Sequence, residues 1–236
     1  VKISSKSKKE LESLAKSDAF KVGKSFSKAE ILPLVSMTAV ESDCQNSKQL
    51  LHDIKDIEKP SEVPKTFNGT LRSYQEFGFN WLTFLYKSGL GGILADDMGL
   101  GKTIQTIAFC CSIKDSNPIL IIGPNNVIYN WQNEIETFCP TKTSLVYQGS
   151  SRQNLVSKFN QTDFIITTLG TLKNDIEIFN QIKFSATFID EAQYIKNPQA
   201  QISKAVKTIN TPFKIALTGT PIENNLQDLW SLGDFI

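Results

Sequence analysis

The 236-residue chain is long enough for one large domain, and its composition, 40% hydrophobic and 21% charged, excludes an intrinsically disordered protein. Twenty-five basic and twenty-four acidic side chains give a formal net charge of +1, which excludes a histone-like polybasic binder and confines any nucleic-acid contact to a local surface. The apolar runs are too short to cross a membrane, and the N-terminus lacks the apolar core of a secretion signal. Because the chain opens on Val1 rather than methionine, we expect it to be an excerpt of a longer protein.

Residues 1–66 differ from the rest of the chain. They hold twelve lysines and ten acidic residues, and they contain no strand-like run. Helical patterns occur at residues 11–20, 27–30 and 48–57, and the prolines at positions 60 and 64 resist helix formation. The pattern predicts an accessory helical segment that ends in a linker, and no residue in it points to a chemistry.

From residue 67 onward, helical and strand patterns alternate. The first helical pattern turns five apolar side chains inward: Tyr74, Phe77, Trp81, Leu82 and Leu85. Apolar runs that predict strands follow at residues 92–95, 119–122, 145–147, 164–167, 187–189 and 214–217, with helical patterns between most of them. Continuous apolar strands that alternate with helices predict an α/β domain over residues 67–236, with a parallel sheet covered on both faces.

The cysteine and tryptophan residues of the chain are expected to pack in the core rather than to serve a metal or redox function. Cys44, Cys110, Cys111 and Cys139 lack the spacing of metal ligands, and the adjacent pair lies in an apolar helical pattern. Core packing is likewise the interpretation we favour for Trp81, Trp131 and Trp230.

A glycine-rich segment, Asp-Asp-Met-Gly-Leu-Gly-Lys-Thr at residues 96–103, follows the first predicted strand and opens a helix. Gly99 and Gly101 let successive backbone N–H groups point at phosphate oxygens, and the helix N-terminus favours negative charge. Lys102 can reach the β- and γ-phosphates, and the Thr103 hydroxyl can bind Mg²⁺. The residues expected around the nucleotide here are Asp97, Met98, Gly99, Leu100, Gly101, Lys102, Thr103 and Ile104. Because Asp96 stands where the full phosphate-loop pattern has glycine, a simple β–α turn with a solvated lysine is the alternative.

An acidic pair, Asp190 and Glu191, follows the apolar strand at residues 187–189. Carboxylates at that position emerge at the carboxyl edge of the sheet, where α/β proteins bind ligands. Asp190 would hold Mg²⁺, directly or through water, and Glu191 would orient and deprotonate the attacking water. Alone, such a pair could merely cap the next helix, but together with the loop at residues 96–103 it predicts a site for a Mg²⁺–nucleoside triphosphate.

In the order of its motifs, the chain from about residue 63 to residue 236 resembles the Swi/Snf-type DNA-translocating ATPases of helicase superfamily 2. Residues 70–75 are similar to the family's opening element, and residues 93–103 to its phosphate loop. Residues 122–131 resemble motif Ia, and residues 166–172 resemble motif Ib. Residues 190–193 resemble motif II in a DEAQ form, and residues 217–230 resemble motif III with its extension. The match is closest to bacterial members, so the resemblance implies a cytoplasmic, nucleoid-associated protein.

The resemblance also implies roles for particular residues. Gln75 and Arg72 would recognise adenine, so ATP with Mg²⁺ is the expected cofactor. Double-stranded DNA would contact Pro124, Asn125, Asn126, Thr167, Thr168 and Gly170, and the residues that couple the nucleotide site to DNA would be Gln193, Thr218, Gly219 and Thr220. Ordinary loop and cap chemistry is the alternative for Asn125, Thr167 and Thr168. With thirteen basic and fourteen acidic side chains in residues 67–236, DNA binding should be weak and independent of sequence.

Family members hold ATP and DNA between two RecA-like lobes, and the resemblance implies that residues 67–236 are the first of these lobes, without the second. Neither Arg72 nor Arg152, the two arginines of the chain, is a convincing substitute for the second lobe's arginine fingers. Such a finger contributes about 10³–10⁵ in turnover, so we expect this segment to bind ATP but hydrolyse it feebly. Two other functions stay open: the ATP-binding lobe of a strand-separating helicase or restriction-type translocase, and a nucleotide-dependent module that binds an unidentified protein partner.

Overall fold

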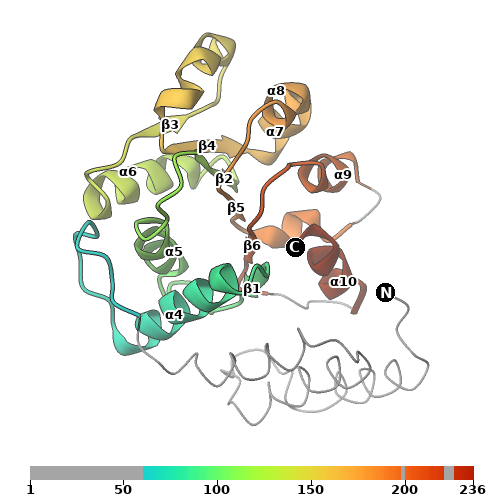
Figure 1. Cartoon of the computed structure of the whole chain (residues 1–236). Coiled ribbons are helices and arrows are strands. Elements are labelled where there is room, and N and C mark those ends of the chain that lie inside the picture. Colours follow the sequence, from blue (N-terminus) through green and yellow to red (C-terminus); the bar gives the residue numbers. More distant parts are fainter. Residues whose placement is uncertain (1–60, 198–199, 221–225) are drawn as a thin grey trace. The chain divides into compact units, whose positions relative to one another are not determined.

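The structure is a computed structural model that describes residues 61–197, 200–220 and 226–236, without the side chains of residues 226–230 (Figure 1). The helical segment predicted within residues 1–60 and the start of the motif III extension at residues 221–225 lie outside this description. The side chain of Trp230 lies outside it as well.

Six parallel strands form the central sheet. They are β1 (Gly92–Leu94), β2 (Ile119–Gly123), β3 (Ser144–Val146), β4 (Phe164–Thr168), β5 (Ala186–Ile189) and β6 (Lys214–Leu217). Their order across the sheet is β1-β6-β5-β2-β4-β3, and every neighbouring pair is parallel. Each strand falls on one of the apolar runs in the sequence, so the predicted parallel sheet is confirmed.

Helices cover the sheet on both faces (Figure 1). One face carries α4 (Ser73–Lys87), α5 (Lys102–Cys110) and α6 (Ile128–Phe138). The other carries α7 (Leu169–Asn174), α8 (Ile176–Asn180), α9 (Gln201–Lys207) and α10 (Leu226–Phe235), while the 3₁₀ helices η3 (Arg152–Gln161) and η4 (Ala192–Ile195) lie in the connections. Successive strand residues point to opposite faces, so Ile119 and Ile121 pack in one apolar cluster while Leu120 and Ile122 pack in the other.

The inward face of α4 differs from the prediction. Leu82 and Leu85 are buried as expected, but Tyr74 and Phe77 are exposed, with 39% and 53% of their surface accessible. Gln75 and Gly78 occupy the buried face in their place. A Cβ on Gly78 would lie 1.7 Å from Oε1 of Gln105, so glycine at this position lets α4 approach α5 closely. The prediction was wrong because it assigned the buried face by hydrophobicity, whereas close contact between the helices decides it.

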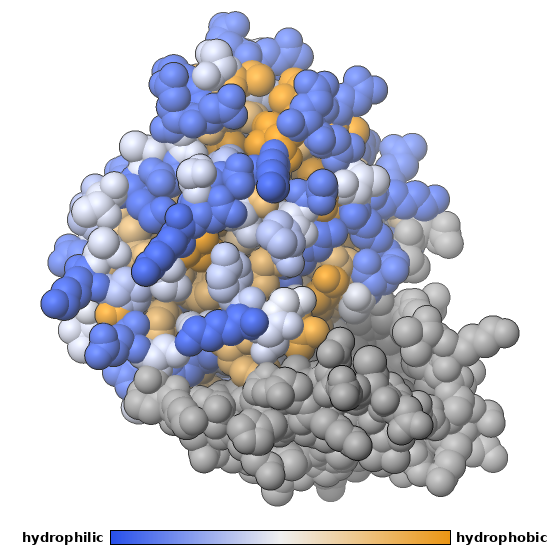
Figure 2. Space-filling model, viewed as in Figure 1, coloured by the Kyte–Doolittle hydropathy of each residue, from blue (hydrophilic) through white to orange (hydrophobic). Residues whose placement is uncertain are grey.

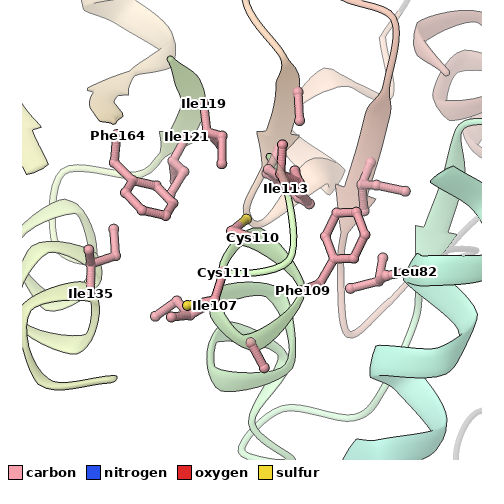
Figure 3. Packing of buried hydrophobic residues seen from close by; sticks show 14 of the residues in the cluster. Leu82, Ile107, Phe109, Cys110, Cys111, Ile113, Ile119, Ile121, Ile135 and Phe164 are labelled. Carbon is pink, nitrogen blue, oxygen red and sulfur yellow. The ribbon is translucent and has the colours of Figure 1, made fainter. Parts of the chain in front are cut away.

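Core packing of the cysteines is confirmed for those that the structure describes. Cys110, Cys111 and Cys139 are buried and free, and burial raises the pKa of the Cys110 thiol. Figure 3 shows Cys110 at the end of α5 and Cys111 directly after it, with Ile135 of α6 and Leu82 of α4 on either side of that helix. The same cluster holds Trp131, which is 1% exposed.

The residues just before the predicted domain boundary also pack on this domain. The backbone N–H of Ser61 donates to Asn80 Oδ1 at 2.9 Å, and Val63 packs against the apolar cluster beneath α4, α5 and α6. On the face seen in Figure 2, hydrophilic and hydrophobic side chains are interspersed. Among the helices that the structure describes, none is long and apolar enough to span a membrane.

Candidate functional site

Most of the predicted site residues lie at the carboxyl ends of five neighbouring strands, whereas Arg72 and Gln75 lie at the start of α4. The glycine-rich loop comes after β1, Thr218 to Thr220 after β6, and the acidic pair after β5, while residues 124–126 follow β2 and Thr168 closes β4. Because every strand is parallel, these segments meet at a single edge of the sheet. The topology therefore assembles residues that lie more than a hundred positions apart in the sequence.

The loop after β1 has the backbone shape of an anion cradle. Gly99 and Gly101 adopt left-handed conformations, with φ of +83° and +79°, which favour glycine. Gly101 is the N-cap of α5, so the first N–H groups of that helix face the loop. Lys102 opens α5, and its ammonium donates to the carbonyl oxygens of Asp96 at 2.7 Å and Asp97 at 3.1 Å. The ammonium thus lies against the backbone of its own loop, at the start of the helix whose N-terminus favours phosphate.

Two glutamine side chains, those of Gln75 and Gln105, donate hydrogen bonds to this loop. Gln75 Nε2 donates to the Leu100 carbonyl at 3.3 Å, and Gln75 Oε1 accepts from the Arg72 backbone N–H at 2.9 Å. Gln105, which is fully buried, donates to Asp96 Oδ2 at 2.9 Å and more weakly to the Leu100 carbonyl at 3.4 Å. Gln105 was missed by sequence reasoning, although an amide on the apolar face of a helix was a signal that it needed a buried partner.

Asp190 is held at three points. Its backbone N–H donates to the Ile122 carbonyl at 2.7 Å, its Oδ1 accepts from the Glu191 backbone N–H at 2.9 Å, and its Oδ2 accepts from the Trp131 indole at 2.8 Å. Burial raises the pKa of the Asp190 carboxyl, and the hydrogen bonds from Trp131 and the Glu191 backbone oppose that rise. The side chain is therefore partly withdrawn from solvent in one defined orientation.

Glu191 has the only left-handed backbone among the non-glycine residues that the structure describes, with φ of +51°. Such a conformation costs an L-residue about 1–2 kcal/mol and is concentrated at functional sites. Its carboxylate accepts a hydrogen bond from Gln193 Nε2 at 2.6 Å. The turn after β5 thus separates the two acids, with Asp190 facing α6 and Glu191 facing η4.

A side-chain bridge joins the acidic pair to the loop after β6. Gln193, which donates to Glu191, accepts from the Thr218 hydroxyl at 3.0 Å through its Oε1. Thr218 is fully buried, and its hydroxyl oxygen accepts from the Thr220 N–H at 3.1 Å. A Cβ on Gly219 would lie 3.0 Å from Met98 Cγ, so this loop also touches the glycine-rich loop. Gln193, Thr218, Gly219 and Thr220, the residues expected to couple, therefore contact one another and both parts of the predicted nucleotide site.

The residues present fit a magnesium nucleotide. No group of three or more His, Cys, Asp or Glu side chains within the described residues could hold a metal alone. Magnesium commonly takes only one or two protein oxygens and completes its shell with phosphate oxygens and water. The Asp190 carboxylate and the Thr103 hydroxyl are hard oxygen donors of that kind, beside a cradle formed by backbone N–H groups.

The residues expected to contact nucleic acid differ in how far they are exposed to solvent. Asn125 and Asn126 are exposed, and Asn125 Oδ1 accepts from Gln148 Nε2 at 3.0 Å. Pro124 is half-buried and Gly170 is exposed. Thr168 caps α7 by accepting the Thr171 N–H at 3.1 Å, whereas Thr167 is fully buried and donates to the Tyr147 carbonyl at 2.9 Å. The Thr167 hydroxyl therefore does not face a ligand, in agreement with the structural alternative for that residue.

Arg152 is accounted for by the fold. Its guanidinium makes two hydrogen bonds to the Asp175 carboxylate, and the Tyr147 hydroxyl donates to the same carboxylate at 2.9 Å. The bond from Arg152 holds the pKa of Asp175 below its usual value. Arg152 therefore ties η3 to the α7–α8 junction and, as expected, does not lie at the acidic pair.

Comparisons with known proteins agree with this arrangement. The SNF2-related domain matches residues 74–236. The chain is 40% identical to YwqA of Bacillus subtilis over 202 residues, and 36% identical to the chromatin-remodeling ATPase INO80 of Arabidopsis thaliana over 204 residues. These alignments cover 80% and 77% of this chain but only 22% and 14% of the relatives.

A solved structure agrees as well. It is the Sulfolobus solfataricus SWI2/SNF2 ATPase core in complex with double-stranded DNA, and it is 42% identical to this chain, with a TM-score of 0.68. The alignment covers 75% of this chain and 38% of that one. With its glycine-rich loop, acidic pair and bridging glutamine at one edge of a parallel sheet, the chain belongs to the SNF2-related family.

Proposed function

We propose that this chain is the ATP-binding first lobe of a double-stranded-DNA-dependent ATPase that couples Mg–ATP hydrolysis to movement on DNA. The observation that carries the proposal is the bridge from Glu191 through Gln193 to Thr218. This bridge joins the acidic pair to the loop after β6, and that loop also contacts the glycine-rich loop. The Sulfolobus SWI2/SNF2 core bound to double-stranded DNA and the relative described as a chromatin-remodeling ATPase support the reaction and its substrate.

In this proposal the loop after β1 and the start of α5 bind the phosphates. Backbone N–H groups near Gly99 and Gly101 bind phosphate oxygens, and Lys102 exchanges its loop carbonyls for the β- and γ-phosphates. Gln75 and Arg72 lie at the start of α4, and Gln75 donates a hydrogen bond to the carbonyl of Leu100 in the loop. In this proposal Gln75 has two roles, since it supports the loop and hydrogen-bonds adenine.

Hydrolysis falls to the acidic pair. Asp190 and Thr103 would hold magnesium, which would neutralise the charge that develops on the phosphates. Glu191 accepts a proton from the attacking water, and the hydrogen bond from Gln193 orients its carboxylate for that task. Because Gln193 also accepts from Thr218, a displacement of the loop after β6 would change the orientation of Glu191.

DNA lies along the loops that follow β2 and β4 in this proposal. Asn125, Asn126 and the backbone near Gly170 are exposed there and neutral, so they can position phosphates but carry no sequence information. A second lobe in the full-length protein completes both sites. The proposal includes a bacterial origin, with which the 40% identity to YwqA of Bacillus subtilis is compatible, and for a bacterial protein that acts on DNA it includes a cytoplasmic, nucleoid-associated location.

The experiment is a comparison of duplex DNA, single-stranded DNA and RNA as stimulants of ATP hydrolysis by the full-length protein. We expect duplex DNA to stimulate most, independently of its sequence. Stronger stimulation by single strands or RNA would instead favour the strand-separating helicase. Stimulation by no nucleic acid, with Mg–ATP binding intact, would favour the protein-interaction module.

A further inference from the structure

Trp131 combines core packing with one polar bond. Only 1% of its surface is exposed, and it packs in the apolar cluster beneath α4, α5 and α6. Its indole Nε1 nevertheless donates to Asp190 Oδ2 at 2.8 Å, across 59 positions of sequence. An indole N–H is a donor only, so its partner here must offer a lone pair.

The bond from Trp131 completes the support of the Asp190 carboxylate. Glu191 provides a backbone N–H to Oδ1, and Trp131 provides an indole N–H to Oδ2. One donor comes from the turn after β5 and the other from near the start of α6, so two independent elements define the plane of the carboxylate. Each oxygen keeps a lone pair for a metal ion or a metal-bound water.

The rigid surroundings of Trp131 make it suited to this task. On α6, Ile128 and Ile135, three positions before it and four after it, are fully buried on the same helix face. The indole therefore cannot turn away from Asp190 without disturbing the contact between α6 and the sheet. At metal sites, residues that hydrogen-bond the ligands commonly contribute 10–100-fold to metal affinity.

We infer that Trp131 is a positioning residue for magnesium binding, which orients the Asp190 carboxylate toward the metal through its indole N–H. This inference rests on the proposed function, because it presupposes that Asp190 holds magnesium. It adds to the proposed site a residue on α6 that touches neither nucleotide nor metal. In the sequence, Trp131 lies in the segment that resembles motif Ia, and core packing is the interpretation favoured for its side chain, because neither spacing nor composition indicates which buried carboxylate an indole meets.

The first test is the magnesium dependence of nucleotide binding by the 236-residue chain. Calorimetry measures binding of the non-hydrolysable analogue AMP-PNP over a series of Mg²⁺ concentrations and in EDTA. For Trp131→Phe, we expect the apparent Mg²⁺ affinity to fall about tenfold or more, with AMP-PNP affinity in EDTA unchanged. Ile135→Val is the matched control, since it alters packing on the same face of α6 and removes no hydrogen bond; its Mg²⁺ dependence should equal that of the wild type.

The outcomes separate the inference from the proposed function. If Mg²⁺ does not raise the AMP-PNP affinity of the wild type, both the proposed metal site and the inference are overturned. If Mg²⁺ raises the AMP-PNP affinity of the wild type and of Trp131→Phe equally, only the inference is overturned. Equal losses in EDTA and in Mg²⁺ would show a purely structural role for Trp131 and would also overturn it.

A second measurement needs no variant to fold. The chain has three tryptophans, so its ¹⁵N–¹H spectrum contains three indole signals, which can be assigned through the backbone. Adding Mg²⁺ to the AMP-PNP-bound wild type should shift the Trp131 indole signal more than that of Trp81, which stacks on Phe84 in α4. An unmoved Trp131 signal, at Mg²⁺ concentrations that strengthen nucleotide binding, would overturn the inference.

Discussion

The carboxyl edge of the sheet has two unlike halves. In the nucleotide half, formed by residues 95–101, 190–193 and 218–220, side chains from different loops bond one another, as Gln193 does with Glu191 and Thr218. In the β2–β4 half, formed by residues 124–126 and 167–170, the side chains are neutral, and the hydroxyls of Thr167 and Thr168 bond nearby backbone. In the nucleotide half, hydrogen bonds between side chains hold charged groups in place. In the β2–β4 half, the exposed groups are backbone and neutral side chains. Substitutions should therefore affect the two halves very differently.

The largest effect is expected from Glu191→Gln in a protein that contains both lobes. Removing the proton acceptor while leaving Asp190 in place should lower turnover by about 10²-fold or more. Binding of Mg–ATP should stay within about twofold, since the phosphate cradle and the metal carboxylate are intact. Steady-state hydrolysis and calorimetry on the same preparation measure both quantities, and parallel losses of binding and turnover would contradict the role given to Glu191.

The next largest effect should follow from Lys102→Ala. Losing a charged hydrogen bond to the phosphates costs about 1.5–3 kcal/mol, or about 10–150-fold in affinity for Mg–ATP. Calorimetry on the 236-residue chain is the measurement. Lys204→Ala is the matched control, since Lys204 is an exposed lysine of α9 outside the predicted site residues, and this variant should bind as the wild type does. Unchanged affinity in the Lys102 variant would rule out the phosphate-loop assignment.

A moderate effect is expected from Thr218→Val, which preserves shape and removes the hydroxyl that donates to Gln193. If this bridge relays DNA binding to the acidic pair, stimulation of ATP hydrolysis by duplex DNA should fall about fivefold or more, while Mg–ATP affinity changes little. Thr187→Val tests specificity, because Thr187 is equally buried on β5 but belongs to no such bridge. Equal DNA stimulation in both variants would remove the coupling role.

The smallest effects belong to the β2–β4 half. DNA binding by this chain alone should be no tighter than about 10⁻⁵ M near physiological salt, with a shallow salt dependence and equal affinity for unrelated sequences. Asn126→Ala should weaken binding by about two- to tenfold, the range of one neutral hydrogen bond. Thr167→Val should leave it unchanged because that side chain is buried. Fluorescence anisotropy with short duplexes tests all three statements, and tight or sequence-selective binding would locate the DNA surface elsewhere.

The sequence by itself determined the sheet, the glycine-rich loop and the acidic pair. Continuous apolar runs specify strands buried on both faces, and positions that need a left-handed backbone or a charge admit few residue types. Gly99, Gly101, Lys102 and Asp190 were therefore recognisable without coordinates. The resemblance to a family added Gln193 and Thr218, whose contacts no spacing argument supplied.

Only the tertiary structure decided which side chains meet. The exposure of Phe77, the burial of Thr167 and the bonds from Gln105 and Trp131 depend on how closely helices approach one another and the sheet. In a hydrophobic pattern, a buried indole appears only as a core position, and a buried amide appears only as a polar residue on an apolar helix face. Its hydrogen-bond partner comes from a distant segment, as Asp190 does for Trp131, and becomes known only when packing brings the two together.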